Sequence, residues 1–180
     1  MPDPTPPRRQ NVVLVGFMGA GKSSIARLVA RSLGFEGVDT DDLVVENARM
    51  PIHRIFQERG EEAFRDLESA ALLSLAEREN LVISTGGGLV LREANRKQLR
   101  ALGFTVWLSA SVEATYARVR HNRDRPLLRV PDPQATIAEL LAARAPLYKE
   151  SADLHIDTTN LSMDDIAYGV TESARHAFSR

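Results

Sequence analysis

The sequence predicts an α/β protein with three layers, in which a sheet lies between helices. Short aliphatic segments alternate along the chain with longer segments of helical periodicity, and the first aliphatic segment suits a strand buried on both faces of a parallel sheet. The chain has 180 residues, of which 43% are hydrophobic and 26% charged, so it is large enough to build one core. We therefore expect a single domain.

The expected strands and helices follow one another in a regular order. The first strand, at 11–15, ends at a glycine, and a helix follows at 22–33, where apolar residues recur at helical spacing and Gly34 supplies a stop. The other strands are expected at a short extended piece ending at Asp39 and at 81–85, 104–108 and 154–156. The other helices are expected around an interruption near Pro51, at 61–79, up to about Leu102, from about Ser111, at 134–149, and after Ser162, where Asp165 completes a capping box.

Two segments fall outside this alternation. Residues 1–10 are rich in proline and lack the hydrophobic stretch of a secretory signal, so we expect a disordered tail before a folded domain at 11–180. The stretch 121–133 is polar and rich in arginine and proline, and we expect it to be a mobile loop.

Composition excludes several classes of partner. A net charge of -1 and a pI of about 6.4 give no basic field for nucleic acid or for an anionic membrane. The chain has no cysteine, which excludes disulfides and thiolate metal sites, and no apolar run approaches the roughly 20 residues that cross a bilayer. We expect a small-molecule partner and a cytoplasmic location.

Residues 16–23, Gly-Phe-Met-Gly-Ala-Gly-Lys-Ser, match the phosphate-binding pattern G-x-x-x-x-G-K-[ST] at every fixed position. The glycines let backbone N–H groups point at phosphate oxygens, and the N-terminal end of the following helix favours anions. Lys22 would bridge the β- and γ-phosphates of ATP, and Ser23 would ligate Mg²⁺. A flexible turn is the plain alternative, but a chance match in this length is on the order of one in a hundred.

Such a loop does not by itself separate a kinase from a GTPase, a motor or a noncatalytic nucleotide sensor. The chain contains no N-K-x-D or T-K-x-D stretch to read guanine, which argues against a GTPase, and it is short for a motor. The remaining motifs must decide.

Asp39, Thr40 and Asp41 follow the second expected strand. They would therefore lie at the carboxyl edge of the sheet, where open α/β proteins bind ligands, with both carboxylates facing the phosphates. The alternative is structural, because Asp41 or Asp42 could simply cap the following helix.

Four further motifs are less specific than the phosphate loop when each is taken alone. Arg65 and Glu68 lie three residues apart on one helix face and could merely pair with each other. The glycine run at 86–88 is costly in chain entropy unless the backbone approaches something closely, and we expect a ligand there. Arg125 stands beside a rigid turn and Arg144 just before a proline that perturbs helices, and either could simply be solvated.

Together these motifs resemble those of the shikimate kinases. They are G-x-x-G-x-G-K-S at 16–23, D-T-D at 39–41, F-R-x-x-E at 64–68, G-G-G at 86–88, R-P-L-L at 125–128 and R-x-P-L-Y at 144–148, all in the family's order. The resemblance implies a P-loop kinase fold with a five-stranded parallel sheet, related to nucleoside monophosphate kinases. An acceptor-binding region at about 39–68 and a lid at about 121–133 would belong to the same domain.

The activity implied by the resemblance is transfer of the γ-phosphoryl group of ATP to the 3-hydroxyl of shikimate, a step in aromatic amino acid biosynthesis, by a protein that we expect to be a monomer. On the nucleotide side, Arg118 would lie over the adenine, and Arg125 would swing in with the lid to neutralise phosphate charge. Asp39 would support the Mg²⁺ shell through water. The full set of implied ATP contacts is Gly19, Ala20, Gly21, Lys22, Ser23, Ser24, Arg118 and Arg125.

On the acceptor side, the resemblance implies that Asp41 holds the acceptor hydroxyl and accepts its proton. Arg65 and Arg144 would clamp the shikimate carboxylate, because guanidinium presents paired donors that match two carboxylate oxygens. The acceptor would also contact the backbone of Gly86, Gly87 and Gly88. Asp41, Lys22 and Arg125 would then be the catalytic set for a loose phosphoryl-transfer transition state.

Two other functions stay open at this point. A gluconate kinase, or another small-acid or sugar kinase of the same fold, would share the phosphate loop but need not share both arginine motifs and the glycine run. A noncatalytic nucleotide-binding switch would bind ATP without any acceptor that stimulates turnover.

Overall fold

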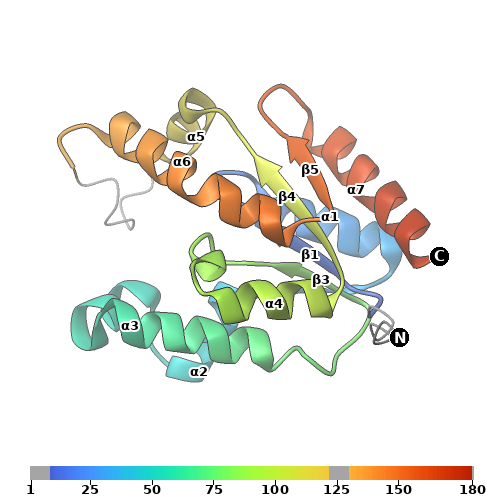
Figure 1. Ribbon diagram of the computed structural model, residues 1–180, viewed down its shortest axis with the longest axis horizontal. Helices are drawn as coiled ribbons and strands as arrows, with labels where there is room; N and C mark the ends of the chain where they lie inside the picture. The colour runs from blue at the N-terminus through green and yellow to red at the C-terminus, as the bar shows by residue number, and fades with distance from the viewer. Residues whose placement is uncertain (1–8, 122–129, 180) are drawn as a thin grey trace, which may run out of the picture.

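The computed structural model describes residues 9–121 and 130–179, in which one sheet carries helices on both faces (Figure 1). The strands are all parallel, lie in the order β2-β3-β1-β4-β5, and comprise β1 (Val12–Val15), β2 (Glu36–Asp39), β3 (Leu81–Ser84), β4 (Phe104–Ser109) and β5 (Leu154–Asp157). The helices are α1 (Lys22–Leu33), α2 (Thr40–Ala48), α3 (Ile52–Leu73), the short 3₁₀ turn η1 (Leu89–Leu91), α4 (Glu93–Leu102), α5 (Val112–Val119), α6 (Pro133–Ser151) and α7 (Met163–Phe178). The predicted three-layer α/β fold with five parallel strands is confirmed.

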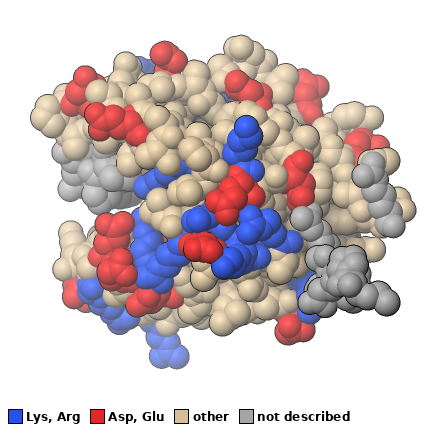
Figure 2. Space-filling model, viewed as in Figure 1, with Lys and Arg blue, Asp and Glu red and all other residues tan. Residues whose placement is uncertain are grey.

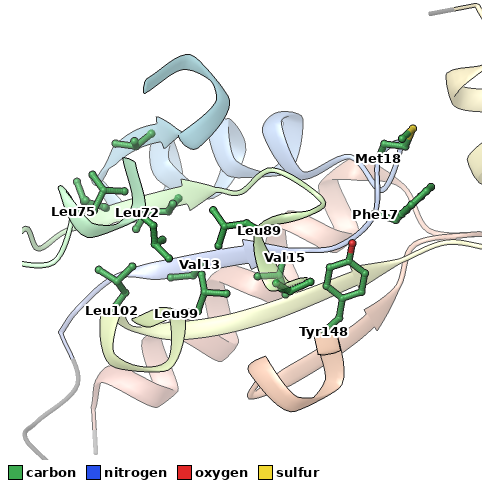
Figure 3. Packing of buried hydrophobic residues seen from close by; sticks show 14 of the residues in the cluster. Val13, Val15, Phe17, Met18, Leu72, Leu75, Leu89, Leu99, Leu102 and Tyr148 are labelled. Atoms are coloured by element: carbon green, nitrogen blue, oxygen red, sulfur yellow. The ribbon is translucent and has the colours of Figure 1, made fainter. Parts of the chain in front are cut away.

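The central strand β1 is buried on both faces, as its sequence predicts. Val12 and Leu14 point to one side, where they pack with residues of α1 and α7. Val13 and Val15 point to the other side, into a second cluster that includes residues of α4 and Tyr148 of α6 (Figure 3). The carboxyl end of β1 is therefore held in the middle of the core, directly before the phosphate loop.

The helices α2 and α3 pack on each other around a small core of their own. Its buried members are Val44, Ile55, Phe64 and Ala71, and the ring of Phe64 lies 4.6 Å from that of Phe56. The predicted acceptor-binding region thus has a separate hydrophobic cluster, between the two helices at the lower edge of Figure 1.

The long helix expected at 61–79 is the main error in the predicted elements. Helical structure begins at Ile52 and ends at Leu73, with a break at Gly60, whose φ of 81° lies in the left-handed region. The helix stops early because the Ser74 hydroxyl donates to the carbonyl of Ala71 and the chain then turns, which buries Leu75 at 1% exposure against the sheet. Apolar spacing could not separate a longer helix from turns that bury the same side.

Several predicted helix boundaries are confirmed. Gly34 ends α1 with a φ of 69°, and the hydroxyl of Ser162 accepts from the backbone N–H of Asp165 at the start of α7. The helix α6 runs through Pro146, since buried side chains before and after the proline hold it in place. In the described ranges 9–121 and 130–179, no helix is long and apolar enough to span a lipid bilayer.

The helix α4 and its N-cap residue Arg92 join α3 to α6 through an array of ion pairs. Arg92 contacts Asp66 of α3 at 2.7 Å, and Arg96 contacts Glu150 of α6 at 3.0 Å. Figure 2 shows the resulting mixture of basic and acidic side chains across the middle of this face. Each of these arginines lies against a carboxylate, so its charge is balanced locally.

Candidate active site

Glycines between β1 and α1 shape the phosphate loop. Gly16 lies against the carbonyl of Leu108, where an added Cβ would collide with that oxygen. Gly21, the residue before α1, has a φ of 87°, in the left-handed region that favours glycine. The loop therefore turns sharply and directs the first turn of α1 toward the carboxyl edge of the sheet, where an anion would meet the positive end of the helix.

Lys22 directs its charge into this loop. Its Nζ donates to the carbonyl of Phe17 at 2.8 Å, and the residue is only 8% exposed. Ser24 lines the neighbouring cleft, whereas the side chain of Ala20 is buried in the core beneath the loop. The loop thus holds one partly desolvated ammonium among backbone groups, an arrangement suited to a polyphosphate.

Ser23 and Asp39 meet at the junction of α1 and β2. The hydroxyl of Ser23 donates to Oδ2 of Asp39 at 2.7 Å and lies 3.2 Å from the hydroxyl of Ser84 at the end of β3. These oxygens come from three adjacent elements of the carboxyl edge. Oxygen atoms are the ligands that Mg²⁺ prefers in proteins, so the group fits the expected metal.

The cap of helix α2 is Asp39. Its Oδ1 accepts from the backbone N–H of Asp41 at 2.9 Å, and its backbone is extended. The alternative that Asp41 or Asp42 caps this helix is therefore wrong, because both lie inside its first turn. Asp41 instead lies beside the glycine run and lines the cleft.

Arg65 and Glu68 form the expected pair on α3. Nη1 of Arg65 lies 2.5 Å from Oε2 of Glu68, and Nη2 lies 3.1 Å from Glu61. Glu68 is 1% exposed, and burial raises the pKa of its carboxyl against the opposing effect of Arg65. Nε of Arg65 is buried and has no hydrogen-bond partner among the described residues, so the guanidinium keeps donor capacity next to the site.

Two of the three glycines at 86–88, Gly86 and Gly88, leave room for the protein's own side chains. A Cβ on Gly86 would meet Oε1 of Glu68 at 2.6 Å and Oδ1 of Asp41 at 2.8 Å, and one on Gly88 would collide with the guanidinium of Arg65. We expected a ligand beside these glycines, but side chains of the protein itself occupy the space next to Gly86 and Gly88. The glycines let Asp41, Glu68 and Arg65 lie against one stretch of backbone.

The helix α6 brings Arg144 and Tyr148 to the same place. Arg144 is 8% exposed, and its guanidinium carbon lies 5.4 Å from the ring centre of Phe17 in the phosphate loop. The hydroxyl of Tyr148 donates to the carbonyl of Gly87 at 2.6 Å. Neither arginine of the expected clamp is solvated, because each is held by buried neighbours.

Arg118 lies on the other side of the phosphate loop. Its Nη1 donates to the carbonyl of Gly19 and to the hydroxyl of Thr158, both at 3.1 Å, and its Nη2 donates to the carbonyl of Thr158. It therefore links the loop to the segment after β5. Arg125, the expected lid arginine, lies outside the described residues, as does most of the predicted lid.

These groups surround a cleft of about 200 Å³ at the carboxyl edge of the sheet. Its lining is Met18, Gly19, Gly21, Lys22, Ser23, Ser24, Asp39, Asp41, Ser84, Thr85, Gly86 and Gly87. Arg65 and Arg144 are not among the lining residues and lie beside it, against Gly88 and Phe17.

Sequence reasoning missed Ser84, Thr85 and the supporting contact of Thr40. The hydroxyl of Thr40 accepts from the N–H of Gly86 at 3.0 Å, which joins the D-T-D motif to the glycine run. The one available signal was position, since Ser84 and Thr85 end a predicted strand at the same edge.

Comparison with known proteins gives a consistent result. The family model described as shikimate kinase matches residues 18–175. A shikimate kinase of Dechloromonas aromatica is 42% identical over 172 residues, covering 96% of this chain and 92% of the relative. One of Pseudomonas savastanoi is 46% identical over 149 residues, covering 83% and 87%.

Solved structures agree. A shikimate kinase from Acinetobacter baumannii in complex with shikimate matches with a TM-score of 0.89 at 35% identity, over 94% of both chains. A gluconokinase from Sinorhizobium meliloti matches with a TM-score of 0.60 at 19% identity, over 94% of both chains. The second likeness shows a common fold alone.

Proposed function

Since the chain belongs to the shikimate kinase family, we infer that it transfers the γ-phosphoryl group of ATP to the 3-hydroxyl of shikimate. The products are 3-phosphoshikimate and ADP, and the reaction is a step of chorismate and aromatic amino acid biosynthesis. The observation that carries the inference is the meeting of the phosphate loop, Asp41 and the glycine run in one cleft. A phosphoryl donor and an alcohol acceptor can lie there side by side.

On the nucleotide side, we propose that the phosphate loop and the first turn of α1 bind the phosphates of ATP. Lys22 would exchange its contact with the Phe17 carbonyl for the β- and γ-phosphates, whose charge is greater. Arg118 would lie against the adenine, a role supported by its position over Gly19 at the outer side of the loop.

Mg²⁺ belongs to this proposal as a cofactor bound with ATP. Ser23 would be its direct protein ligand and Asp39 would hold it through water, which is supported by their 2.7 Å contact. Among the described residues, no group of three or more His, Cys, Asp or Glu side chains could form a metal site by itself, so phosphate and water would complete the shell. The ion supplies charge that draws the phosphates into line.

On the acceptor side, we propose that Asp41 acts as the general base. It would accept a hydrogen bond from the 3-hydroxyl, orient that oxygen toward the γ-phosphorus, and take the proton as the new bond forms. Its place in the cleft lining, with the capping of α2 left to Asp39, supports this role.

Arg65 and Arg144 are proposed to bind the shikimate carboxylate, with backbone groups of the glycine run contacting the ring hydroxyls. Each guanidinium is oriented before the ligand arrives, Arg65 by Glu68 and Arg144 by the Phe17 ring. Preorientation lowers the side-chain entropy that binding must offset. The charge of Glu68 keeps the clamp from becoming an unbalanced pair of cations.

Other parts of the proposal rest on the sequence alone. Arg125 would contribute positive charge at the transferring phosphoryl group from a lid at about 121–133, which would also exclude water from the transfer. We further propose that the protein is a cytoplasmic monomer, and gel filtration would test the oligomeric state. Of the expected tail at 1–10, residues 1–8 lie outside the described residues, whereas Arg9 pairs with Glu77 at 2.8 Å and the carbonyl of Gln10 accepts from the N–H of Asn80 at 3.0 Å, so the ordered chain begins earlier than expected.

The decisive experiment is an ADP-release assay with Mg-ATP, run with shikimate, with gluconate and with no acceptor. We expect ADP release to depend on shikimate and the product to carry one phosphate on the 3-hydroxyl. Stimulation by gluconate alone would identify a sugar-acid kinase of this fold. ATP binding with no stimulation by either acceptor would support a noncatalytic switch.

A further inference from the structure

Tyr148 ends the R-x-P-L-Y motif and has no part in the chemistry proposed above. We propose that Tyr148 is a positioning residue that holds the glycine run in the orientation needed to receive shikimate and ties it to Arg144. The inference rests on the proposed function, since it concerns how the acceptor site of that reaction is preorganised.

The contact between Tyr148 and the glycine run is short and shielded from water. The hydroxyl lies 2.6 Å from the carbonyl oxygen of Gly87, and the residue is 1% exposed. The tyrosine ring also stacks on Trp107 of β4, with ring centres 6.0 Å apart and planes 26° from parallel. The donor is therefore held by the core of the sheet.

The glycine run needs such a restraint because glycine backbone is the most permissive in the chain. In a trans peptide, the carbonyl of Gly87 and the N–H of Gly88 point in opposite directions, so fixing one fixes the other. Thr40 holds the N–H of Gly86 at 3.0 Å. The hydroxyl of Tyr148 in turn donates to the carbonyl of Gly87, so two long-range contacts orient the peptide planes on either side of the one that joins Gly86 to Gly87.

The same tyrosine reaches the proposed carboxylate clamp. Arg144 precedes Tyr148 by four residues on α6, so both side chains lie on one helix face. Against the raising effect of burial, the charges of Arg144 and Arg65 lower the pKa of the Tyr148 phenol, whereas that of Glu68 raises it, so all three groups lie near the hydroxyl. Tyr148 is thus the point at which α6, the glycine run and the charged groups of the clamp meet.

The hydroxyl of Tyr148 stays protonated at neutral pH and can donate a hydrogen bond. Burial raises the pKa of Tyr148 to about 12, although the neighbouring Arg144 guanidinium acts in the opposite direction. A neutral phenol can donate to a carbonyl, whereas a phenolate cannot. Ionisation of the phenol therefore does not break the contact with Gly87 near neutral pH.

The test compares Tyr148→Phe with Ser151→Ala. The first variant removes the hydroxyl that reaches Gly87 and keeps the ring. The second removes another buried hydroxyl of α6, which donates within the helix to the carbonyl of Leu147 at 2.8 Å and touches no proposed ligand group. Calorimetry would measure shikimate affinity and, separately, affinity for a nonhydrolysable ATP analogue.

We expect Tyr148→Phe to weaken shikimate binding about tenfold, the usual worth of a buried hydrogen bond, and to change nucleotide affinity less than about twofold. Ser151→Ala should leave both affinities unchanged while lowering the melting temperature. If the two variants lose stability alike and both keep wild-type shikimate affinity, the contact of Tyr148 is merely structural and the proposal is overturned.

The wild type separates this inference from the proposed function. Failure of the wild type to bind shikimate would remove the proposed function, whereas unchanged shikimate binding by Tyr148→Phe would remove only the role of Tyr148. Emission from Trp107, the single tryptophan of the chain, reports whether the aromatic stack survives in the variant.

If Tyr148→Phe does not fold, a difluorotyrosine at position 148 decides the matter. Its ring is similar in size, but its hydroxyl loses the proton at lower pH. We expect shikimate affinity to fall along an alkaline pH series in that variant at a pH where the wild type still binds. Parallel pH profiles for the two proteins would overturn the proposal.

Discussion

The nucleotide half and the acceptor half of the cleft are built in different ways. The phosphate loop is one continuous segment, set by glycine geometry and by the strand and helix that flank it. The acceptor half is assembled from α2, α3, the glycine run and α6, which meet through contacts between residues far apart in the sequence. A local motif can therefore supply phosphate binding, whereas acceptor recognition depends on the whole fold.

The substitution with the largest expected effect is Asp41→Asn, which should break the acceptor half alone. Asparagine keeps the shape of the side chain but cannot accept the proton, so turnover should fall roughly 10²–10⁴-fold. ATP affinity and melting temperature should stay near wild type, because Asp39 caps α2. Steady-state turnover measured beside the melting temperature checks this, and near-normal turnover would remove Asp41 from the mechanism.

Lys22→Ala should break the nucleotide half. Loss of the ammonium removes a charge that we propose to contact the transferring phosphoryl group, and we expect turnover to drop roughly 10²–10³-fold. The fold should persist, since the lysine contacts a loop carbonyl. Shikimate affinity, measured without nucleotide, should be unchanged. Substantial remaining turnover would contradict the assigned function of the loop.

Arg144→Lys tests whether the acceptor half needs the paired donors of the guanidinium or only its positive charge. Lysine keeps the positive charge but lacks the paired donors, and the loss of charge-assisted hydrogen bonds is worth roughly 1.5–3 kcal/mol. Shikimate affinity should therefore fall about 10- to 100-fold, with little change for ATP. Titration calorimetry with each ligand would show it, and an unaltered shikimate affinity would locate the carboxylate elsewhere.

The smallest expected effect is that of Glu68→Gln on the pH dependence of the melting temperature. Burial raises the pKa of Glu68, so its contribution to stability is greatest below the ordinary pKa of a glutamate and declines as pH rises through the folded-state value. Glutamine should flatten that part of the pH profile of the melting temperature. Two parallel profiles, wild type and variant, would show that Glu68 does not titrate in this window.

The difference between the two halves also explains how far the sequence could be interpreted. The alternation of strands and helices, and the phosphate loop with its two flanking elements, are local patterns and were predicted from residues 11–33 and their counterparts along the chain. The end of α3 could not be predicted in this way, because turns after Leu73 bury the same apolar positions that a longer helix would bury.

In the acceptor half, the contacts of single residues could not be predicted from the sequence either. Arg65, Glu68 and the glycine run were each visible in the sequence, but the reason for the glycines was not. Only the folded arrangement shows that Gly86 makes room for Asp41 and Glu68, and Gly88 for Arg65. Family resemblance named these residues together without supplying that physical cause.

The parallel sheet also determines where the protein can be attached to something else. Every strand begins at the edge opposite the cleft, and the described chain begins there too, just before β1. The ring of Phe178 at the end of α7 stacks on Phe35 just before β2, so the chain returns to that same edge (Figure 1). A fused domain or a surface tether at the carboxyl terminus would lie away from the cleft, and immobilised enzyme should keep its turnover.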